Sequence, residues 1–186
     1  MAENYVPEAG ASFFAKDSSF EVQRSNHFEI VIDLDHLPFF NNDVHQKYIR
    51  LCCTSAQIPN ITIQPQQLRH GNEVVNVAGS PSYGEISISV YDVIGQDMAG
   101  LLQDWFRQVF DPVTSLMGLV VNYKTTARLY QYSPDASVIR LWTVYGVFPI
   151  SLEFGSATAD GQGQPVTITM RLAVDKAVES LVTKNG

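Results

Sequence analysis

Apolar and polar residues alternate along several runs of this chain of 186 residues, which is the pattern of a β-strand with one buried face. The run at residues 27–34, HFEIVIDL, has an apolar side chain at every second position. Further runs lie at residues 48–56, 60–68, 126–133, 137–154 and 165–174. Pro65 within one of them predicts an edge strand or a bulge, because proline cannot donate to a strand ladder. The pattern predicts a mainly β, antiparallel fold.

Residues 71–92, GNEVVNVAGSPSYGEISISVYD, predict two further strands joined by a turn. The alternation at Val75 and Val77 stops at residues 78–84, which are rich in turn-forming Gly, Ser and Pro. It resumes over residues 86–90. A ribbon of this kind has open edges, and open edges pair with other chains unless something covers them.

One helix is predicted in residues 96–110, QDMAGLLQDWFRQVF. Its apolar residues recur at the i, i+3, i+4, i+7 spacing of a single buried stripe. Those expected to anchor the helix to a sheet are Leu101, Leu102, Trp105 and Phe106. Asp111-Pro112 is expected to end or kink the helix.

The composition indicates one folded domain, with 45% hydrophobic and 17% charged residues. The net charge of -7 does not indicate a basic surface that would hold nucleic acid phosphates. No run approaches the roughly 20 apolar residues of a membrane helix. The N-terminus lacks a signal-peptide pattern. Cys52 and Cys53 are neighbours on an expected strand and point to opposite faces, so we expect free, buried thiols in a reducing cytosol.

Candidate catalytic and metal-binding residues do not form a recognisable constellation. His36 and His45 share a loop with Asp35 and Asp43, but their separation matches no compact ligand spacing, and no metal is expected. No nucleophile elbow or Cys–His signature is present, and Gly161–Gln164 lacks the lysine of a phosphate loop. We therefore expect neither an enzyme nor a cofactor-binding protein.

A series of short motifs between residues 27 and 175 resembles, in the same order, the tail tube proteins of contractile-tailed bacteriophages. The motifs are AQIP (56–59), VNVAG (75–79), YGEISISVYD (83–92), LLQDWF (101–106), ARLYQYSPD (127–135), GVFPISL (146–152) and ITMRLAVD (168–175). The chain departs from the family in a longer N-terminal arm, in the loop 36–46 and at its C-terminus. The division that follows is an arm at 1–26, a tail-tube β domain at 27–175 and an extension at 176–186.

This resemblance implies an antiparallel β-sandwich or barrel with one flanking helix, assembled as six copies per ring. Stacked rings would form a hollow tube, first filled by a tape-measure protein and later crossed by viral DNA without specific binding. The other implied partners are the sheath protein, the baseplate and the tail terminator, with no membrane. The implied location is the virion, after assembly in the host cytoplasm.

Uncharged polar strand faces suit a wet lumen, with the ribbons 71–92 and 141–174 as the inner wall. The candidate lumen-facing residues are Thr62, Gln64, Asn76, Glu85, Ser87, Thr167 and Thr169. Arg171 has the same parity as Thr167 and is expected to be paired. The segments 1–20, 36–46 and 156–164 are expected to be mobile alone and to order between rings.

Three alternatives stay open at this point. The polar faces could be ordinary solvated surface. The chain could be the inner tube protein of a type VI-like or extracellular contractile injection system, which has the same architecture and a different cargo. It could also be a monomeric β-barrel that binds a small apolar ligand.

Overall fold

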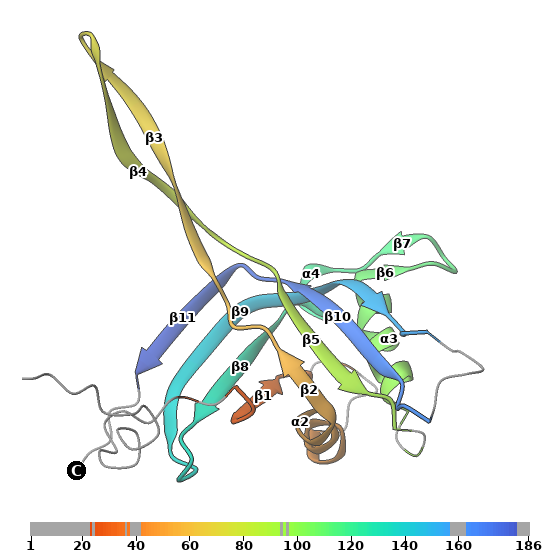
Figure 1. Ribbon diagram of the computed structural model, residues 1–186. Helices are drawn as coiled ribbons and strands as arrows, with labels where there is room; N and C mark the ends of the chain where they lie inside the picture. The colour runs from red at the N-terminus through yellow and green to blue at the C-terminus, as the bar shows by residue number, and fades with distance from the viewer. Residues whose placement is uncertain are drawn as a thin grey trace, which may run out of the picture.

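The computed structural model describes residues 23, 25–35, 37, 42–93, 95, 97–156 and 163–181. These residues form a body built on a curved, seven-stranded antiparallel sheet, and a two-stranded arm projects far from the body (Figure 1). The predicted fold class, mainly β and antiparallel with a flanking helix, is confirmed. The predictions for residues 1–20 and for most of the loop 156–164 lie outside the described residues.

The sheet has the strand order β1-β8-β9-β10-β5-β2, with β11 also paired to β9. Its strands are β1 (Phe28–Ile32), β2 (Cys53–Ala56), β5 (Ile86–Tyr91), β8 (Thr125–Tyr132), β9 (Val138–Glu153), β10 (Thr167–Ala173) and β11 (Lys176–Leu181). The long strand β9 belongs to two halves, because its first part pairs with β8 and β11 and its second part with β10. The two halves slope in different directions (Figure 1).

Gly146 lies where β9 passes from one half of the sheet to the other. The register with β8 shifts there, since Thr126 pairs with Tyr145 and Thr125 with Val147. Gly146 has a φ of 66°, a left-handed conformation that glycine adopts without steric cost. This single residue therefore permits the change of direction that produces two halves.

Both halves and the main helix share one core. From the strands this core receives Ile30, Ile32, Ile86, Ile88, Val90, Ala127, Leu129, Trp142, Val144, Val147, Ile168, Met170, Leu172 and Ala177. The predicted helix is α3 (Met98–Val109), which begins after Asp97, whose side chain accepts a 3.0 Å hydrogen bond from the Gly100 amide. Its residues Leu101, Leu102 and Trp105 are buried, while Phe106 is half-buried. At about 1.5–3 kcal/mol per buried large side chain, this stripe stabilises the helix on the body.

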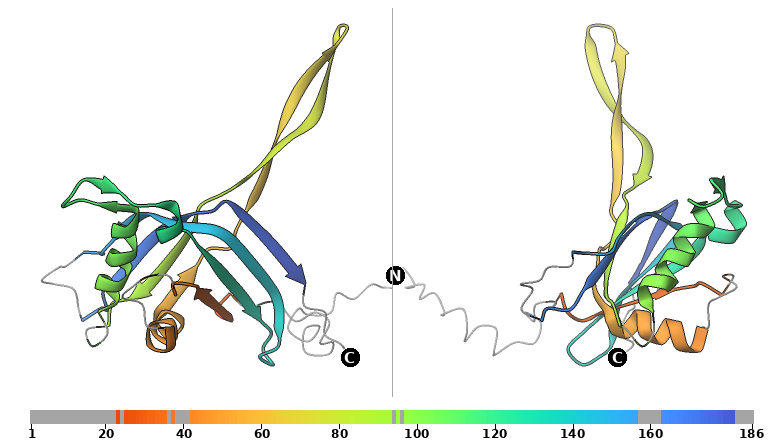
Figure 2. Two further views of the ribbon diagram at one scale, coloured as in Figure 1. Left: turned by 180° about the vertical axis from the view of Figure 1, so that it is seen from behind. Right: turned by 90° about the vertical axis from the view of Figure 1, so that its right-hand side faces the viewer.

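Smaller elements extend the far end of α3. They are a small antiparallel sheet of two strands, β6 (Phe110–Asp111) and β7 (Leu116–Met117), and the short helix α4 (Val120–Tyr123). Figure 2 shows α3 and these elements on one side of the body and the arm pointing away from it.

The single strand predicted over residues 48–56 is wrong in its first part. A π-helical turn, η2 (Asn42–Gln46), leads into the helix α2 (Lys47–Cys52), and only Cys53–Ala56 form a strand. Ile49 and Cys52 are buried one helical turn apart. Arg50 Nε lies 2.6 Å from Glu29 Oε1, which ties α2 to β1. The segment 36–46 was expected to have no regular structure, and η2 corrects this for its last residues; residues 36 and 38–41 lie outside the described part.

The ribbon predicted over residues 71–92 is also wrong in its pairing. Strand β4 (Glu73–Tyr83) pairs with β3 (Ile61–His70) to form the arm, and the turn lies at Gly71-Asn72. All but the last of the expected turn residues lie within β4, where Gly79 and Ser80 stand together opposite Gln64 as a bulge. The bulge expected near Pro65 is confirmed, because the register shifts between Ile63 and Pro65.

Residues 176–181, placed by the sequence in a C-terminal extension, form β11. This strand pairs with the first part of β9 over its whole length, from Lys176 opposite Tyr145 to Leu181 opposite Arg140. The seven-stranded sheet therefore continues past residue 175.

Candidate assembly edges and polar sheet face

Four strands form the half of the sheet that carries most of the candidate residues: β2, β5, β10 and residues 148–153 of β9. We call it the polar half. One row of cross-strand partners runs over all four strands through Ser55, Ser89, Thr169 and Glu153. The Ser89 and Thr169 hydroxyl oxygens are 3.1 Å apart. Because side chains alternate across a strand, the other face carries the buried Ile88, Met170 and their neighbours.

The polar face carries almost no free positive charge. Arg171 is the only basic residue in β2, β5, β10 and residues 148–153. Its Nη1 lies 3.3 Å from Glu85 Oε2, so the pairing expected for Arg171 is present. Both side chains are 53% exposed, and such a pair contributes little to stability. The effect of this ion pair is on the local charge. Glu85 neutralises the charge of Arg171, and Glu153 then gives the polar face a small net negative charge.

The structure divides the predicted lumen-facing set into two groups. Ser87, Thr167 and Thr169 lie together on the polar half, and Glu85 directly precedes β5 beside Arg171. The other three, Thr62, Gln64 and Asn76, lie on the arm. On the arm they do not share one face, because Asn76 pairs with Gln67, which has the opposite parity to Thr62 and Gln64.

Sequence reasoning missed part of this face. Ser55, Ser89, Ser151 and Glu153 belong to it, and none of them was in the predicted set. The two-residue alternation of ISISVY and TITMRL already contained the signal for Ser89. The place of Ser55 and Ser151 depends on pairings between distant segments, which alternation does not specify.

The polar half has two edges without strand partners among the described residues. One is the outer side of β2, the last strand of the sheet order. The other is residues 148–153 of β9, because the pairing of β8 with β9 stops at Val147. The four strands alternate in direction, so the two edges run antiparallel to one another. Each presents unpaired N–H and C=O groups that another strand can bind.

A pocket of about 520 Å³ lies beside the free edge of β2, where β1 approaches β2 without pairing with it. Its lining residues are Ser25, Asn26, Phe28, Cys53, Thr54, Ser55, Ala56, Ile58, Leu129 and Gln131. The Cys53 thiol donates a 3.3 Å hydrogen bond to the Ser55 carbonyl. Burial raises the pKa of Cys53 to about 11, so the thiol is protonated at neutral pH and is a weak nucleophile. Cys52 and Cys53 are both free, as predicted, but of the two only Cys52 is buried, while Cys53 is half-buried.

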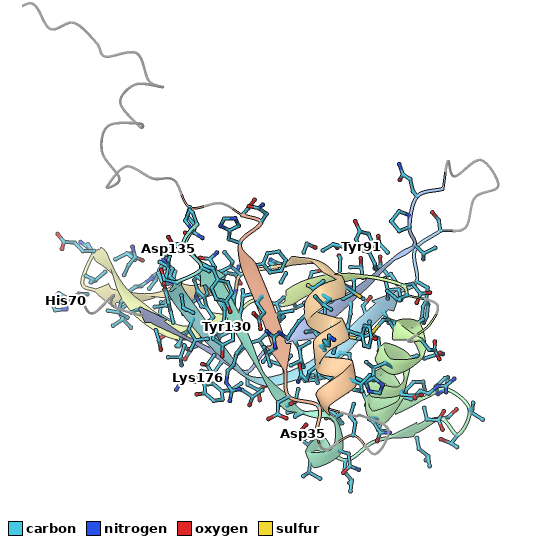
Figure 3. All side chains as sticks on the ribbon, turned by 90° about the horizontal axis from the view of Figure 1, so that it is seen from below. Asp35, His70, Tyr91, Tyr130, Asp135 and Lys176 are labelled. Carbon is cyan, nitrogen blue, oxygen red and sulfur yellow. The ribbon has the colours of Figure 1, made fainter. Side chains whose placement is uncertain are left out.

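The arm is exposed along most of its length and carries apolar side chains. Ile61, Ile63, Leu68, Val74, Val75 and Val77 are all exposed there. His70 lies at the far end of the arm, and Tyr91 lies on the opposite side of the protein (Figure 3). A second exposed apolar surface lies on the segment of β6, β7 and α4, at Val113, Leu116, Met117, Leu119, Val120 and Val121. Apolar surfaces of this extent are typical of sites of protein contact.

The described residues contain no group of three or more His, Cys, Asp or Glu side chains that could hold a metal ion. His36, one of the histidines considered above, lies outside them. Among the helices of the described part, none has the length and apolar character needed to span a membrane.

No protein-family model and no curated protein sequence matches the chain. Solved structures do match it. A chain of the anti-feeding prophage baseplate, determined by cryo-EM and 6-fold symmetrised, is 14% identical with a TM-score of 0.64, covering 88% of this chain and 99% of that one. A chain of the sheath–tube complex of PVC, an extracellular contractile injection system in the extended state, is 15% identical with a TM-score of 0.64, covering 94% and 99%.

Hcp1 from Salmonella typhimurium is 14% identical with a TM-score of 0.50, covering 86% of this chain and 90% of that one. At these identities the likeness is one of fold. The chain has the tail-tube fold, and the fold predicted from the sequence motifs is confirmed.

Proposed function

We propose that this chain is a structural tube subunit, in which copies join edge to edge into rings and the rings stack into a hollow tube. The observation that carries the proposal is the polar half, a four-stranded antiparallel sheet with two unpaired edges and two faces of opposite polarity. The tail-tube fold supports the same assignment.

The direction of the two edges permits copies to join into a ring. Strand β2 of one copy runs antiparallel to residues 148–153 of β9, so β2 can pair antiparallel with that segment of the next copy. A head-to-tail contact of this kind closes into a ring when its rotation is right, and a closed ring has no free edges. Six copies per ring is the number that the 6-fold symmetrised particle of the similar baseplate chain supports.

The faces of the polar half suit the two sides of such a ring wall. The apolar face is already buried in the subunit core, so the hydroxyl-rich face is left for the lumen. With Arg171 paired to Glu85, this wall offers no cluster of cations to DNA phosphates. Viral DNA could therefore pass through the tube without being held. The partners of the proposed tube are a sheath, a tape-measure protein, a baseplate and a tail terminator. Its proposed location is a virion that is assembled in the host cytoplasm.

A second function in the same class is the inner tube of an extracellular contractile injection system. It is favoured by two similar solved structures described above, which belong to an anti-feeding prophage and to an extracellular contractile injection system, each with a TM-score of 0.64. The two functions share the ring and the tube and differ in cargo. Isolating native particles and identifying what fills the tube, DNA or protein, distinguishes them.

The assembly itself is tested by negative-stain microscopy of the purified chain over a range of concentrations. We expect rings with an open centre and, at higher concentration, stacked tubes. A compact monomer at every concentration would contradict the proposal and would favour a monomeric β-barrel instead.

A further inference from the structure

Phe154 is an exposed aromatic residue at the end of the unpaired β9 edge, and the pocket beside β2 lies at the opposite edge of the same half of the sheet. Phe154 directly follows β9 and is 45% exposed. An aromatic side chain in water at a strand edge is costly for a monomer and favourable in an interface, where aromatic residues are enriched.

The strand register places Phe154 and Cys53 at the same level. Cys53 pairs with Val90, and Val90 pairs with Ile168. Thr169 pairs with Glu153, so the next residue outward on β9, Phe154, is level with Ile168. The row therefore begins at Cys53 on one edge and ends at Phe154 on the other.

The two positions also share a face of the sheet. Phe154 has the same parity as Leu152, which packs against the core, and the opposite parity to Ser151 on the polar face. Across the half, Cys53 and Ala56 pair with the buried Val90 and Ile88, so they too lie on the core side. On that side of β2 the pocket is bounded by Phe28 and Leu129.

From this geometry we infer that Phe154 of one copy inserts into the pocket between β1 and β2 of the next copy. The inference rests on the proposed ring, and it specifies what the ring contact contains. When β2 pairs antiparallel with the neighbour's β9, the shared row of the strand register brings Phe154 beside Cys53. Because Phe154 lies on the core side of the sheet, its phenyl group points into the pocket. Cys53 itself lines the pocket, so a side chain that lies beside Cys53 on the core side of β2 lies against the pocket.

The native thiol of Cys53 provides a direct test. In a Phe154→Cys variant, the new thiol of one copy would lie across an antiparallel strand pair from Cys53 of the next, within the Cα separation of about 4.4–6.8 Å that a disulfide needs. We expect assembled tubes of this variant, after mild oxidation, to give a ladder of covalent multimers on a non-reducing gel, with the disulfide located by peptide mass spectrometry.

Two controls make the test specific. Adding Cys53→Ser should abolish the ladder. Tyr145→Cys replaces a residue of equal exposure, 45%, on the other part of β9, and should give no bond to Cys53. A tube that assembles without this disulfide would overturn the inference and leave the proposed function intact, as would a disulfide within one copy. If the unmodified chain forms neither rings nor tubes, the proposed function fails and the inference fails with it.

A second measurement avoids oxidation. Because an aromatic side chain in a desolvated pocket is typical of the residues that dominate interfaces, Phe154→Ala should raise the protein concentration needed for assembly about thirtyfold. The Tyr145→Ala variant should leave it unchanged. Phe154 is exposed in the single copy, so the circular dichroism spectrum of either monomer should match the unmodified chain; unchanged assembly of Phe154→Ala would contradict the inference.

Discussion

The indole nitrogen of Trp105 donates a 2.9 Å hydrogen bond to the main-chain carbonyl of Tyr123. Trp105 is fully buried, and its partner is the last residue of α4. The bond therefore joins the core face of α3 to the segment that leads into β8. Because Trp105 satisfies its single polar group in this way, it can fill the core without an unpaired donor.

Trp105→Ala should destabilise the fold by about 3–5 kcal/mol, as expected when a large buried side chain leaves a cavity. Trp105→Phe keeps an aromatic ring but leaves the Tyr123 carbonyl without its donor, so the loss should be smaller, about 1–3 kcal/mol. Urea denaturation of the unassembled chain measures both. Phe106→Ala, on the half-buried side of the same helix, is the control, and a loss equal to that of Trp105→Ala would mean that α3 is not anchored through Trp105.

Gly146 should be the least replaceable residue of β9. An alanine at its φ of 66° adopts a left-handed conformation that costs about 1–2 kcal/mol, and its Cβ would meet the Asp175 carboxylate. That carboxylate is already 2.6 Å from Lys124 Nζ. We expect Gly146→Ala to lower the unfolding free energy by at least this amount. Gly146→Asn should cost less, because asparagine tolerates this conformation better; the reverse order would show that contact with Asp175, and not the backbone, decides the effect.

Long, strongly periodic segments were predictable from the sequence. Residues 126–133 cover β8 except for its first residue, residues 137–154 and 165–174 contain β9 and β10, and the stripe around Trp105 is α3. Each segment is long enough to distinguish the two-residue alternation of a strand from the 3.6-residue repeat of a helix. The strand prediction for residues 48–56 was wrong because, over so short a stretch, Tyr48, Ile49 and Cys52 fit the spacing of a helix as well as that of a strand. Only the burial of Ile49 and Cys52 against the body selects a helix.

The arm was missed for a different reason. Residues 78–83 have the composition of a turn, yet they form a strand because their partner β3 supplies the pairing and a bulge at Gly79 and Ser80 absorbs the irregularity. Proline is tolerated in an exposed ribbon without further neighbours, as at Pro65 and Pro81. The unpaired edges at Cys53 and Phe154 were equally beyond sequence reasoning, since they depend on where pairing between distant segments stops.

We expect the exposed apolar residues of the arm to contact the next ring of the stack, so shortening the arm should block stacking and leave ring formation intact. Replacing residues 64–80 with Asn-Gly joins Ile63 to Pro81, which already face one another, through a two-residue turn. The arm contributes only Tyr83 to the edge of the core, and this change retains it, so the melting temperature should be unchanged. Microscopy should then show single rings in place of tubes. Tubes of normal length would mean that the exposed apolar residues of the arm do not join successive rings.

Positive charge on the polar face should hinder DNA without hindering assembly. In Ser87→Lys combined with Thr169→Lys, the polar half keeps its backbone pairing and its buried face, and it loses only the hydroxyl contact between Ser89 and Thr169. The added cations would attract DNA phosphates with a strength that falls as salt rises.

In particles whose tubes conduct DNA, ejection should therefore slow at low salt and recover at high salt. The control is Ser180→Lys, an exposed position on β11 in the other half of the sheet, which adds charge away from the polar face. Equal slowing by Ser180→Lys would indicate a general charge effect. Normal ejection from particles that carry both lysines at positions 87 and 169 would show that the polar half does not line the channel. The edge pairing of β2 and β9 is tested separately, by the disulfide between positions 154 and 53.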